Sequence, residues 1–439
     1  MSLLLAWTFN ALYLCAITLA SPWILWSALR HGKYREGFKE KLLGLVPQRS
    51  GDRPCVWLHA VSVGEVNLLA TTLREFRIAR PDWQLVISTT TKAGYGLARK
   101  KYSDHPVFYC PLDFSWAVKR ALRRIRPQLL ILAELELWPN LLGAAKEQGV
   151  PVAIINGRLS DKSFRGYVKI RPLVARVLRE VDLVAAQNRE TAERFLQLGA
   201  RSEAVHITGS LKFDGATTDR DNPRTRELRH LAKISDDDVV LLFGSTQAPE
   251  EAIGLELFRK LAGEFPHLRL AIVPRHPQRF DEVAELLARS GLPWARRSTL
   301  VDSEIRTPNS AIILVDTIGE LGAWWGTATI GFVGGSFGSR GGQNMLEPAA
   351  YGVATCFGPN TWNFRDIVAQ LLAVEGAVVV ADTEQLEQFV RRALTAPAWA
   401  VGLAGRARSL VLSQQGATRR TLELLLPLVE LQIPQEIAA

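Results

Sequence analysis

The chain has 439 residues, of which 47% are hydrophobic and 22% charged, with a formal net charge of +9. This is the composition of a globular protein with room for two cores, and it excludes disordered and repeat proteins. The four cysteines (Cys15, Cys55, Cys110 and Cys356) show no C-x-x-C spacing, so neither a zinc site nor a disulfide framework is predicted.

The first thirty residues are predicted to be a membrane anchor. Residues 2–29 contain no charged side chain and include three tryptophans, and cationic residues follow between positions 30 and 41. An uncharged stretch of this length can span a bilayer, and the cationic flank would keep the rest of the chain in the cytoplasm. A cleaved signal peptide is disfavoured, because it would carry positive charge before the apolar run. Pro22 leaves open a kinked helix that lies partly in the membrane interface.

From Cys55 onward, short apolar runs alternate with amphipathic stretches, which predicts parallel sheets covered by helices. A first series has strands at 55–60, 84–90, 107–110, 129–134 and 152–156, and helices at 65–79, 92–102, 114–125, 138–147 and 163–179. A second series has strands at 239–245, 268–274, 311–316, 329–335, 353–357 and 377–381, and helices at 250–264, 279–289, 319–326, 344–351, 362–374 and 383–395.

The two series predict an α/β protein with two Rossmann-like domains. We expect the anchor at 1–30, the first domain at 31–214, a polar linker at 215–238 and the second domain at 239–439. Because open parallel sheets bind ligands at the carboxyl ends of their strands, the chemistry is expected in a cleft between the βα loops of two facing domains.

Three residues of the first domain are candidates for chemistry. Glu65 lies in the first turn of a helix after the first strand, where the helix N-terminus should keep it ionised and able to act as a base. Glu134 and Glu136 follow the fourth strand and should point opposite ways, and Glu134 is favoured for the cleft. Lys212 could meet a carboxylate or phosphate of a donor. A glutamate that only offsets the helix dipole and a solvated lysine are the plainer alternatives.

The second domain offers a glycine-rich loop for phosphate. Gly334, Gly335 and Ser336 follow an apolar strand, and their backbone N–H groups could approach phosphate oxygens. The helix that opens at Asn344 adds unpaired N–H groups. Glu347 lies one turn inside that helix, where a carboxylate can accept two hydrogen bonds from a ribose.

Two further loops of the second domain are predicted to bind anions. Arg275, which follows Pro274 at the end of a strand, suits bidentate contact with a phosphate. The segment Ile318-Gly319-Glu320 opens another helix. No metal is expected, because the D-x-D spacings fall in the linker and Arg275 could offset the charge of a leaving group.

The cationic excess is concentrated in the first domain, where residues 92–179 hold 17 Lys and Arg against 6 Asp and Glu. Such a surface suits anionic lipid headgroups or a phosphorylated acceptor, with solvated helix faces as the plainer alternative for any one cluster. Nucleic acid is not expected as a partner, because no recognition motif accompanies the charge.

Eight motifs in order resemble those of the bacterial 3-deoxy-D-manno-octulosonic acid (Kdo) transferase family. They are HAVSVGE (59–65), AELELWPN (133–140), NGRLS (156–160), AAQN (185–188), TGSLKFD (208–214), VPRHP (273–277), FVGGSF (332–337) and NMLEPAAYG (344–352). The resemblance implies a GT-B fold and the transfer of Kdo from CMP-Kdo to the lipid A precursor, with inversion, at the cytoplasmic face of the inner membrane.

The resemblance also implies roles for residues of this chain. Glu65 would be the general base, and Glu134 and Lys212 would support the transition state. The residues implied to hold CMP are Pro274, Arg275, Ile318, Gly319, Glu320, Asn344, Met345, Leu346 and Glu347.

Two alternatives stay open at this point. A GT-B transferase or epimerase that uses a UDP-sugar is one, since Glu347 and the glycine loop would serve any nucleotide sugar. A membrane-tethered scaffold without activity is the other, and the presence of Glu65, Glu134, Lys212 and Arg275 argues against it.

Overall fold

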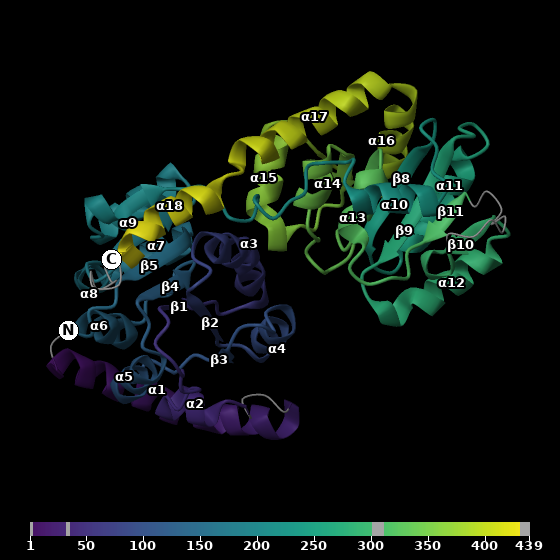
Figure 1. The fold of residues 1–439 in the computed structure, drawn as a ribbon. Helices are drawn as coiled ribbons and strands as arrows, with labels where there is room; N and C mark the ends of the chain where they lie inside the picture. The colour runs from purple at the N-terminus through teal and green to yellow at the C-terminus, as the bar shows by residue number, and fades with distance from the viewer. Residues whose placement is uncertain (1–2, 32–35, 301–310, 431–439) are drawn as a thin grey trace. The chain divides into compact units, whose positions relative to one another are not determined.

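The computed structural model describes residues 3–31, 36–300 and 311–430. The chain forms two compact units, one made of Met1–Gly215 together with Gln415–Ala439 and the other of Ala216–Gln414. Each unit is built around one parallel sheet covered by helices (Figure 1). The predicted class of two parallel-sheet α/β domains is therefore confirmed.

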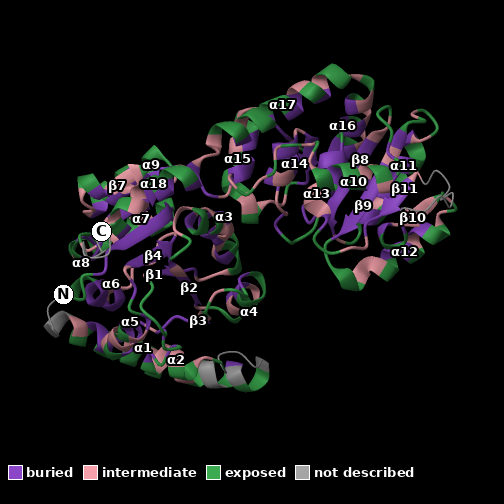
Figure 2. Cartoon of the chain, viewed as in Figure 1, coloured by how far each residue is buried: buried purple, intermediate pink, exposed green. Residues whose placement is uncertain are grey.

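The sheet of the first unit has the strand order β3-β2-β1-β4-β5-β6-β7. The strands are β1 Cys55–His59, β2 Gln84–Thr89, β3 Val107–Tyr109, β4 Leu129–Ala133, β5 Val152–Gly157, β6 Leu183–Ala186 and β7 Val205–Ile207. β1 and β4 are buried along their whole length, as apolar strands are when helices cover both faces of a sheet (Figure 2). The short strands β6 and β7 were not among the predicted elements.

Ten α-helices belong to the described part of the first unit. They are α1 Leu3–His31, α2 Phe38–Leu43, α3 Val63–Ala79, α4 Lys92–Lys101, α5 Ser115–Ile125, α6 Pro139–Glu147, α7 Asp161–Lys169, α8 Arg171–Leu178, α9 Arg189–Leu198 and α18 Ala417–Glu430, with a 3₁₀ turn η1 at Ser202–Ala204. The helix predicted over 163–179 is two helices, α7 and α8. Pro172 lies in the first turn of α8, where its missing N–H costs nothing but would break a continuous helix.

The sheet of the second unit has the strand order β10-β11-β9-β8-β12-β13-β14. The strands are β8 Val239–Thr246, β9 Leu268–Pro274, β10 Trp294–Arg296, β11 Ile312–Leu314, β12 Ile330–Val333, β13 Ala354–Phe357 and β14 Val378–Val379. The helices are α10 Pro223–Leu231, α11 Glu250–Leu261, α12 Phe280–Arg289, α13 Leu321–Thr327, α14 Leu346–Tyr351, α15 Arg365–Ala373, α16 Thr383–Thr395 and α17 Pro397–Gln414, with 3₁₀ turns η2 Pro277–Arg279, η3 Arg297–Thr299 and η4 Trp362–Phe364.

The strand order reverses direction once in each sheet, between β1 and β4 in the first unit and between β8 and β12 in the second. At these places the strands pair directly, with Val56 opposite Leu129 and Leu241 opposite Ile330. The loops that leave two such strands turn to opposite faces of the sheet, and ligands of open parallel sheets bind in the crevice between them. The candidate site of each unit is therefore expected at this edge.

The division of the chain differs from the predicted linker at 215–238 and second domain at 239–439. α10, inside the predicted linker, is part of the second unit, and its Thr225 packs so closely on Gly326 that a Cβ there would lie 2.4 Å from Thr225 Oγ1. α18 returns to the first unit, because Leu422, Leu425 and Val429 share an apolar cluster with side chains of α3.

The N-terminal helix α1 is held against the first unit by buried polar contacts. Asn10, which is 2% exposed, donates from Nδ2 to Ser115 Oγ (2.8 Å) and accepts the Ser115 N–H (2.9 Å), and the Tyr13 hydroxyl donates to Asp113 (3.2 Å). Among the described residues, no helix combines the length and the apolarity needed to cross a membrane, so the predicted span is not supported. Residues 32–35 of the cationic flank lie outside the described residues.

The return of α18 generates a stability prediction. Leu425 is fully buried in the cluster shared with α3, so Leu425→Ala should destabilise the first unit by about 2–5 kcal/mol through lost burial and a residual cavity. Thermal unfolding followed by circular dichroism measures the change, with Glu423→Ala on the exposed face of the same helix as the control. Equal melting temperatures for the two variants would contradict the docking of α18.

Candidate functional site

Glu65 lies in the first turn of α3, directly after the loop that leaves β1. Ser62 accepts the N–H of Glu65, and the Glu65 carboxylate reaches back to accept the Ser62 hydroxyl on Oε1 (2.7 Å) and the Val61 N–H on Oε2 (2.8 Å). This is the reciprocal capping box of an S-x-x-E helix start. Burial raises the pKa of Glu65, and the charge of Glu134 adds to the increase while the hydrogen bonds oppose it. The direction is opposite to the effect expected of the helix N-terminus, because lost hydration outweighs it.

The acidic loop after β4 brings two more carboxylates to the same edge. Glu134 adopts a left-handed backbone with φ of 58°, and its N–H donates to the Ile155 carbonyl (2.9 Å). Burial, followed by the charges of Glu65 and Glu134, raises the pKa of Glu136 to about 7. Both loop glutamates therefore interact with Glu65. The prediction that the two side chains point opposite ways misapplied the period of a strand, because residues i and i+2 of an extended segment lie on the same face.

Lys212 lies in the turn that follows β7. The preceding residue, Leu211, is buried in the apolar cluster that also contains Ala60, Val66 and Ala133. Val66 adjoins Glu65 and Ala133 adjoins Glu134 in the sequence. Residues that adjoin all three predicted catalytic residues therefore belong to the same apolar cluster.

The glycine loop of the second unit is occupied by a carboxylate of the chain itself. Glu250, which is 1% exposed, accepts the N–H groups of Gly335 (2.8 Å), Ser336 (3.1 Å) and Phe337 (3.2 Å). A Cβ at position 334 would lie 2.7 Å from Glu250 Oε2, so the glycine makes room for that carboxylate. The N–H groups predicted to bind phosphate are thus already engaged in this conformation, and the loop is a nest filled from within.

Ser336 also has a structural place in the loop. Its hydroxyl donates to the Val333 carbonyl (2.6 Å) and accepts the Gly358 N–H (2.8 Å), and the residue is fully buried. Its side chain therefore joins the ends of β12 and β13.

Arg275, Asn344 and Glu347 form the second cluster at this sheet edge. Asn344 Nδ2 donates to Glu347 Oε1 (3.0 Å), and Asn344 Oδ1 accepts the Leu346 N–H (3.1 Å). Burial raises the pKa of Glu347, while Asn344 and the positive charge of Arg275 oppose the increase. Arg275 itself is exposed, and its guanidinium makes no hydrogen bond or ion pair with any described residue. The arrangement offers a cation for an anion beside a carboxylate that can accept hydroxyl donors.

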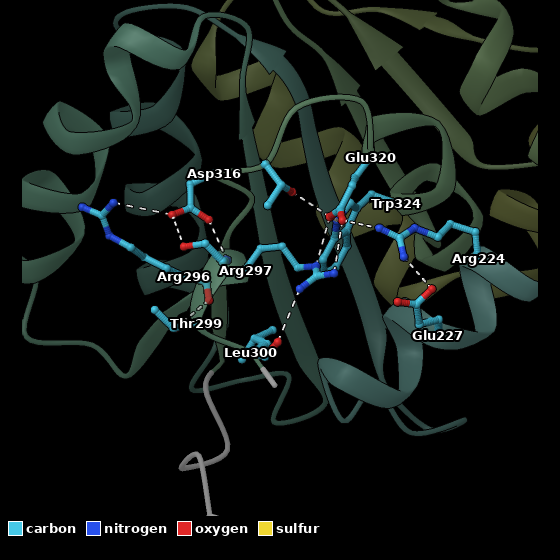
Figure 3. A network of polar contacts seen from close by, with 11 residues as sticks. Arg224, Glu227, Arg296, Arg297, Thr299, Leu300, Asp316, Glu320 and Trp324 are labelled. Carbon is cyan, nitrogen blue, oxygen red and sulfur yellow. Dashed lines mark hydrogen bonds and ion pairs between the residues drawn. The ribbon is translucent and has the colours of Figure 1, made fainter. Parts of the chain in front are cut away.

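The Glu320 side chain is the centre of a network of ion pairs (Figure 3). It receives a two-point contact from Arg297 (3.0 and 3.1 Å), a hydrogen bond from Thr317 (2.6 Å) and an ion pair from Arg224. Burial alone would raise the pKa of Glu320, but Thr317 and the two arginines hold it below its ordinary value. The carboxylate is thus committed to joining the segments around it, which its position in the predicted CMP loop did not indicate.

The other predicted donor residues divide into exposed and buried ones. Ile318 is 78% exposed, and nothing lies within 4 Å of a Cβ built on Gly319, whose φ is 88°. Pro274 ends β9 opposite Thr246, and Met345 and Leu346 are buried. Of these five residues, only Ile318 and Gly319, in the loop before α13, are therefore accessible at the surface of the unit.

Within the described part of the chain, no three His, Cys, Asp or Glu side chains come together in a way that could hold a metal ion.

Two important glutamates escaped the sequence reasoning. Glu136 was not predicted for the site because it was expected to point away from Glu134, although residues i and i+2 of an extended segment share a face and the acidic pair was itself a signal. Glu250 was overlooked because its partners lie 85 to 87 residues further along the chain. The sequence did contain one signal for Glu250. Like Glu65, it is a glutamate in the first turn of a helix that follows a strand.

Comparisons with known proteins agree with one family. Residues 36–215 match the family model of the 3-deoxy-D-manno-octulosonic-acid transferases (kdotransferase). The 3-deoxy-D-manno-octulosonic acid transferase of Haemophilus influenzae is 33% identical over 95% of this chain and 96% of its own. That of Bordetella pertussis is 34% identical over 84% of this chain and 86% of its own.

Among solved structures, the UDP-GlcNAc 2-epimerase of Neisseria meningitidis has a TM-score of 0.56, covering 85% of this chain and all of that one at 14% identity. At such low identity the likeness shows the fold alone. With the two sequence relatives covering most of both chains, this chain belongs to the 3-deoxy-D-manno-octulosonic acid transferase family.

Proposed function

We propose that this glycosyltransferase moves Kdo from CMP-Kdo to the lipid A precursor, lipid IVA, with inversion at the anomeric carbon. The observation that carries the proposal is the group of carboxylates at the reversal of strand order in the first unit, where Glu65 has a raised pKa beside Glu134 and Glu136. A carboxylate with a raised pKa is a stronger base than an ordinary one and is suited to accept the proton of a sugar hydroxyl.

In the proposed reaction, the acceptor hydroxyl loses its proton to Glu65 while its oxygen attacks the anomeric carbon of Kdo. The bond between that carbon and the CMP phosphate oxygen breaks, and CMP leaves with the electron pair. One displacement of this kind inverts the anomeric carbon. Glu134 and Lys212 are assigned to the transition state, where a carboxylate and an ammonium stabilise opposite developing charges.

The donor is assigned to the second unit. Arg275 would contact the phosphate, since its side chain is exposed. Glu347 would accept hydrogen bonds from the ribose hydroxyls, since among the described residues it accepts a hydrogen bond only from Asn344. The exposed loop at Ile318 and Gly319 completes the CMP surface. In the proposed GT-B fold, the second unit holds the donor and the first unit holds the acceptor. No metal cofactor is included, because Arg275 can offset the phosphate charge as CMP leaves.

The proposed place of action is the cytoplasmic face of the inner membrane. Trp7, Trp23 and Trp26 of α1 are 67%, 57% and 50% exposed, and tryptophan favours the membrane interface. Because Asn10 and Tyr13 tie this helix to the first unit, the proposal has α1 lying on the membrane surface. An acceptor embedded in that surface would then reach the Glu65 edge without leaving the bilayer.

The test is a transfer assay with detergent-solubilised full-length protein. CMP-Kdo and lipid IVA should give acceptor-dependent release of CMP and a product heavier by one or more Kdo units. UDP-sugars tested in parallel address the alternative donor, which has the support of fold likeness alone. Turnover with a UDP-sugar and none with CMP-Kdo would overturn the proposal.

Replacing the base generates a second prediction. Glu65→Gln should lower kcat about 10²- to 10⁴-fold, because an amide cannot take the proton. The melting temperature should stay close to that of the wild type, since glutamine also completes a capping box. In the wild type, kcat/KM should fall as pH is lowered, with a midpoint above pH 4.5, because the pKa of Glu65 is raised. Glu75→Gln on the same helix, whose partner is Arg74, is the matched control. Near-normal turnover by Glu65→Gln would remove this residue as the base.

Glu136 generates a prediction that does not depend on activity. An unfolded glutamate titrates near pH 4.3, whereas burial raises the pKa of folded Glu136 to about 7. Between these values the folded state binds the additional proton, so this residue makes stability fall as pH rises, and the loss is complete above pH 7. Glu136→Gln removes the effect. Its melting temperature relative to wild type should therefore be higher at pH 8 than at pH 5. Exposed Glu193 supplies the control, and a difference independent of pH would contradict the raised pKa.

A further inference from the structure

Asn156 stands out because a buried polar side chain is combined with an unusual backbone. It lies near the end of β5, is fully buried, and has φ of 54°. Left-handed backbone costs an ordinary residue about 1 kcal/mol, although asparagine tolerates it better than most. No other residue of β5 has a positive φ. The left-handed backbone at Asn156 therefore interrupts the regular alternation of side chains along the strand.

The Asn156 amide is directed at the segment that carries Lys212. Oδ1 accepts the Leu211 N–H (3.0 Å) and the Ser210 hydroxyl (3.5 Å). Both partners are donors, so the oxygen and not the nitrogen of the amide must face them. Nδ2 is buried and has no partner among the described residues. A buried donor without a partner destabilises the folded state, and here the two hydrogen bonds accepted by Oδ1 offset that loss.

The same residue joins two neighbouring strand ends through its backbone. The Asn156 carbonyl accepts the side-chain N–H of Gln187 (3.2 Å), which follows β6. The Ala186 carbonyl in turn accepts the Thr208 N–H (3.0 Å), at the start of the Lys212 segment. The segment is thus fixed to β6 at its beginning and to Asn156 in its middle, directly before Lys212.

The far side of the segment is held independently. Asp214 accepts the N–H of Gly416 (2.7 Å) and that of Thr418, at the start of α18, and Gln415 donates to the Phe213 carbonyl (3.2 Å). These bonds fix the residues after Lys212. Only the Asn156 side chain holds the residues immediately before it among the hydrogen bonds described, apart from a turn between Ser210 and Phe213.

We propose that Asn156 is a positioning residue for Lys212. By accepting the Leu211 N–H, it fixes the backbone immediately before Lys212 and so the point from which the lysine side chain starts. A lysine has a four-carbon stem with many rotamers, so the placement of its ammonium depends on where its backbone is held. Loss of this hold should slow the chemical step more than it weakens substrate binding. The inference rests on the proposed role of Lys212 in transfer.

Asn156→Gly is the decisive variant, because glycine adopts the same φ without strain while the side chain that accepts the Leu211 N–H is removed. The expected result is a fall in kcat of about tenfold or more with KM changed less than threefold. In hydrogen exchange, the peptide over 208–213 should exchange faster than in the wild type. Asn222→Gly is the matched control, since Asn222 also accepts a backbone N–H through Oδ1 but caps α10 in the second unit.

A double-mutant cycle separates positioning from general destabilisation. If Asn156 acts through Lys212, then Asn156→Gly should change kcat less than twofold in a Lys212→Ala background, whereas independent effects would multiply. Asn156→Asp, which keeps an acceptor oxygen, should restore exchange protection and most of kcat. This variant also carries the test if Asn156→Gly does not fold.

Three results would overturn the inference: unchanged kcat in folded Asn156→Gly, multiplicative effects in the cycle, or no recovery in Asn156→Asp. Full activity of Lys212→Ala would overturn it together with the assigned role of the lysine. Transfer of Kdo by the wild-type protein in the same experiment would still stand, so failure of the inference is distinguishable from failure of the proposed function.

Discussion

Direct pairing of two strands whose loops turn to opposite faces is the constraint on which each unit depends. In the first unit the register of β1 with β4 brings the Glu65 loop beside the acidic loop at Glu134. In the second, the register of β8 with β12 brings Glu250 beside the glycine loop. A slip of either pair would move these groups apart and exchange the side chains packed on the two covered faces of the sheet, so the apolar core that fixes the register also fixes where these groups lie.

The two units place a glutamate in an equivalent position and surround it differently. Burial raises the pKa of both Glu65 and Glu250, but Glu65 has the carboxylates of Glu134 and Glu136 as neighbours. Glu250 is enclosed by the N–H groups of the loop it organises, together with that of Gln247 (2.9 Å). A carboxylate already saturated by donors is a structural element, whereas one in electrostatic competition with like charges is suited to proton transfer. This contrast is the reason that the proposed function takes Glu65, and not Glu250, as the base and Arg275 as the contact of the donor phosphate.

Sequence patterns predicted the strands well, because buried parallel strands are uninterrupted apolar runs and their helices are amphipathic. They also located Glu65, since a helix start after a strand is a local feature. The filled nest at Gly335 and the return of α18 were beyond them, because each depends on partners distant in the chain. The sequence prediction was also wrong for the loop at Glu134, because residues i and i+2 of an extended segment share a face. It was wrong for the first thirty residues as well, where the apolar composition gave no sign of the polar contacts of Asn10 and Tyr13.

The central claim is that the second unit binds a cytidine nucleotide through Arg275 and not through its glycine loop. Calorimetric titration of CMP and UMP into wild-type protein and Arg275→Ala tests it most directly. The account predicts tighter binding of CMP than of UMP, and a loss of about tenfold or more in CMP affinity for Arg275→Ala with an unchanged melting temperature. Equal binding of CMP by the variant and the wild type, or a preference for UMP, would contradict it.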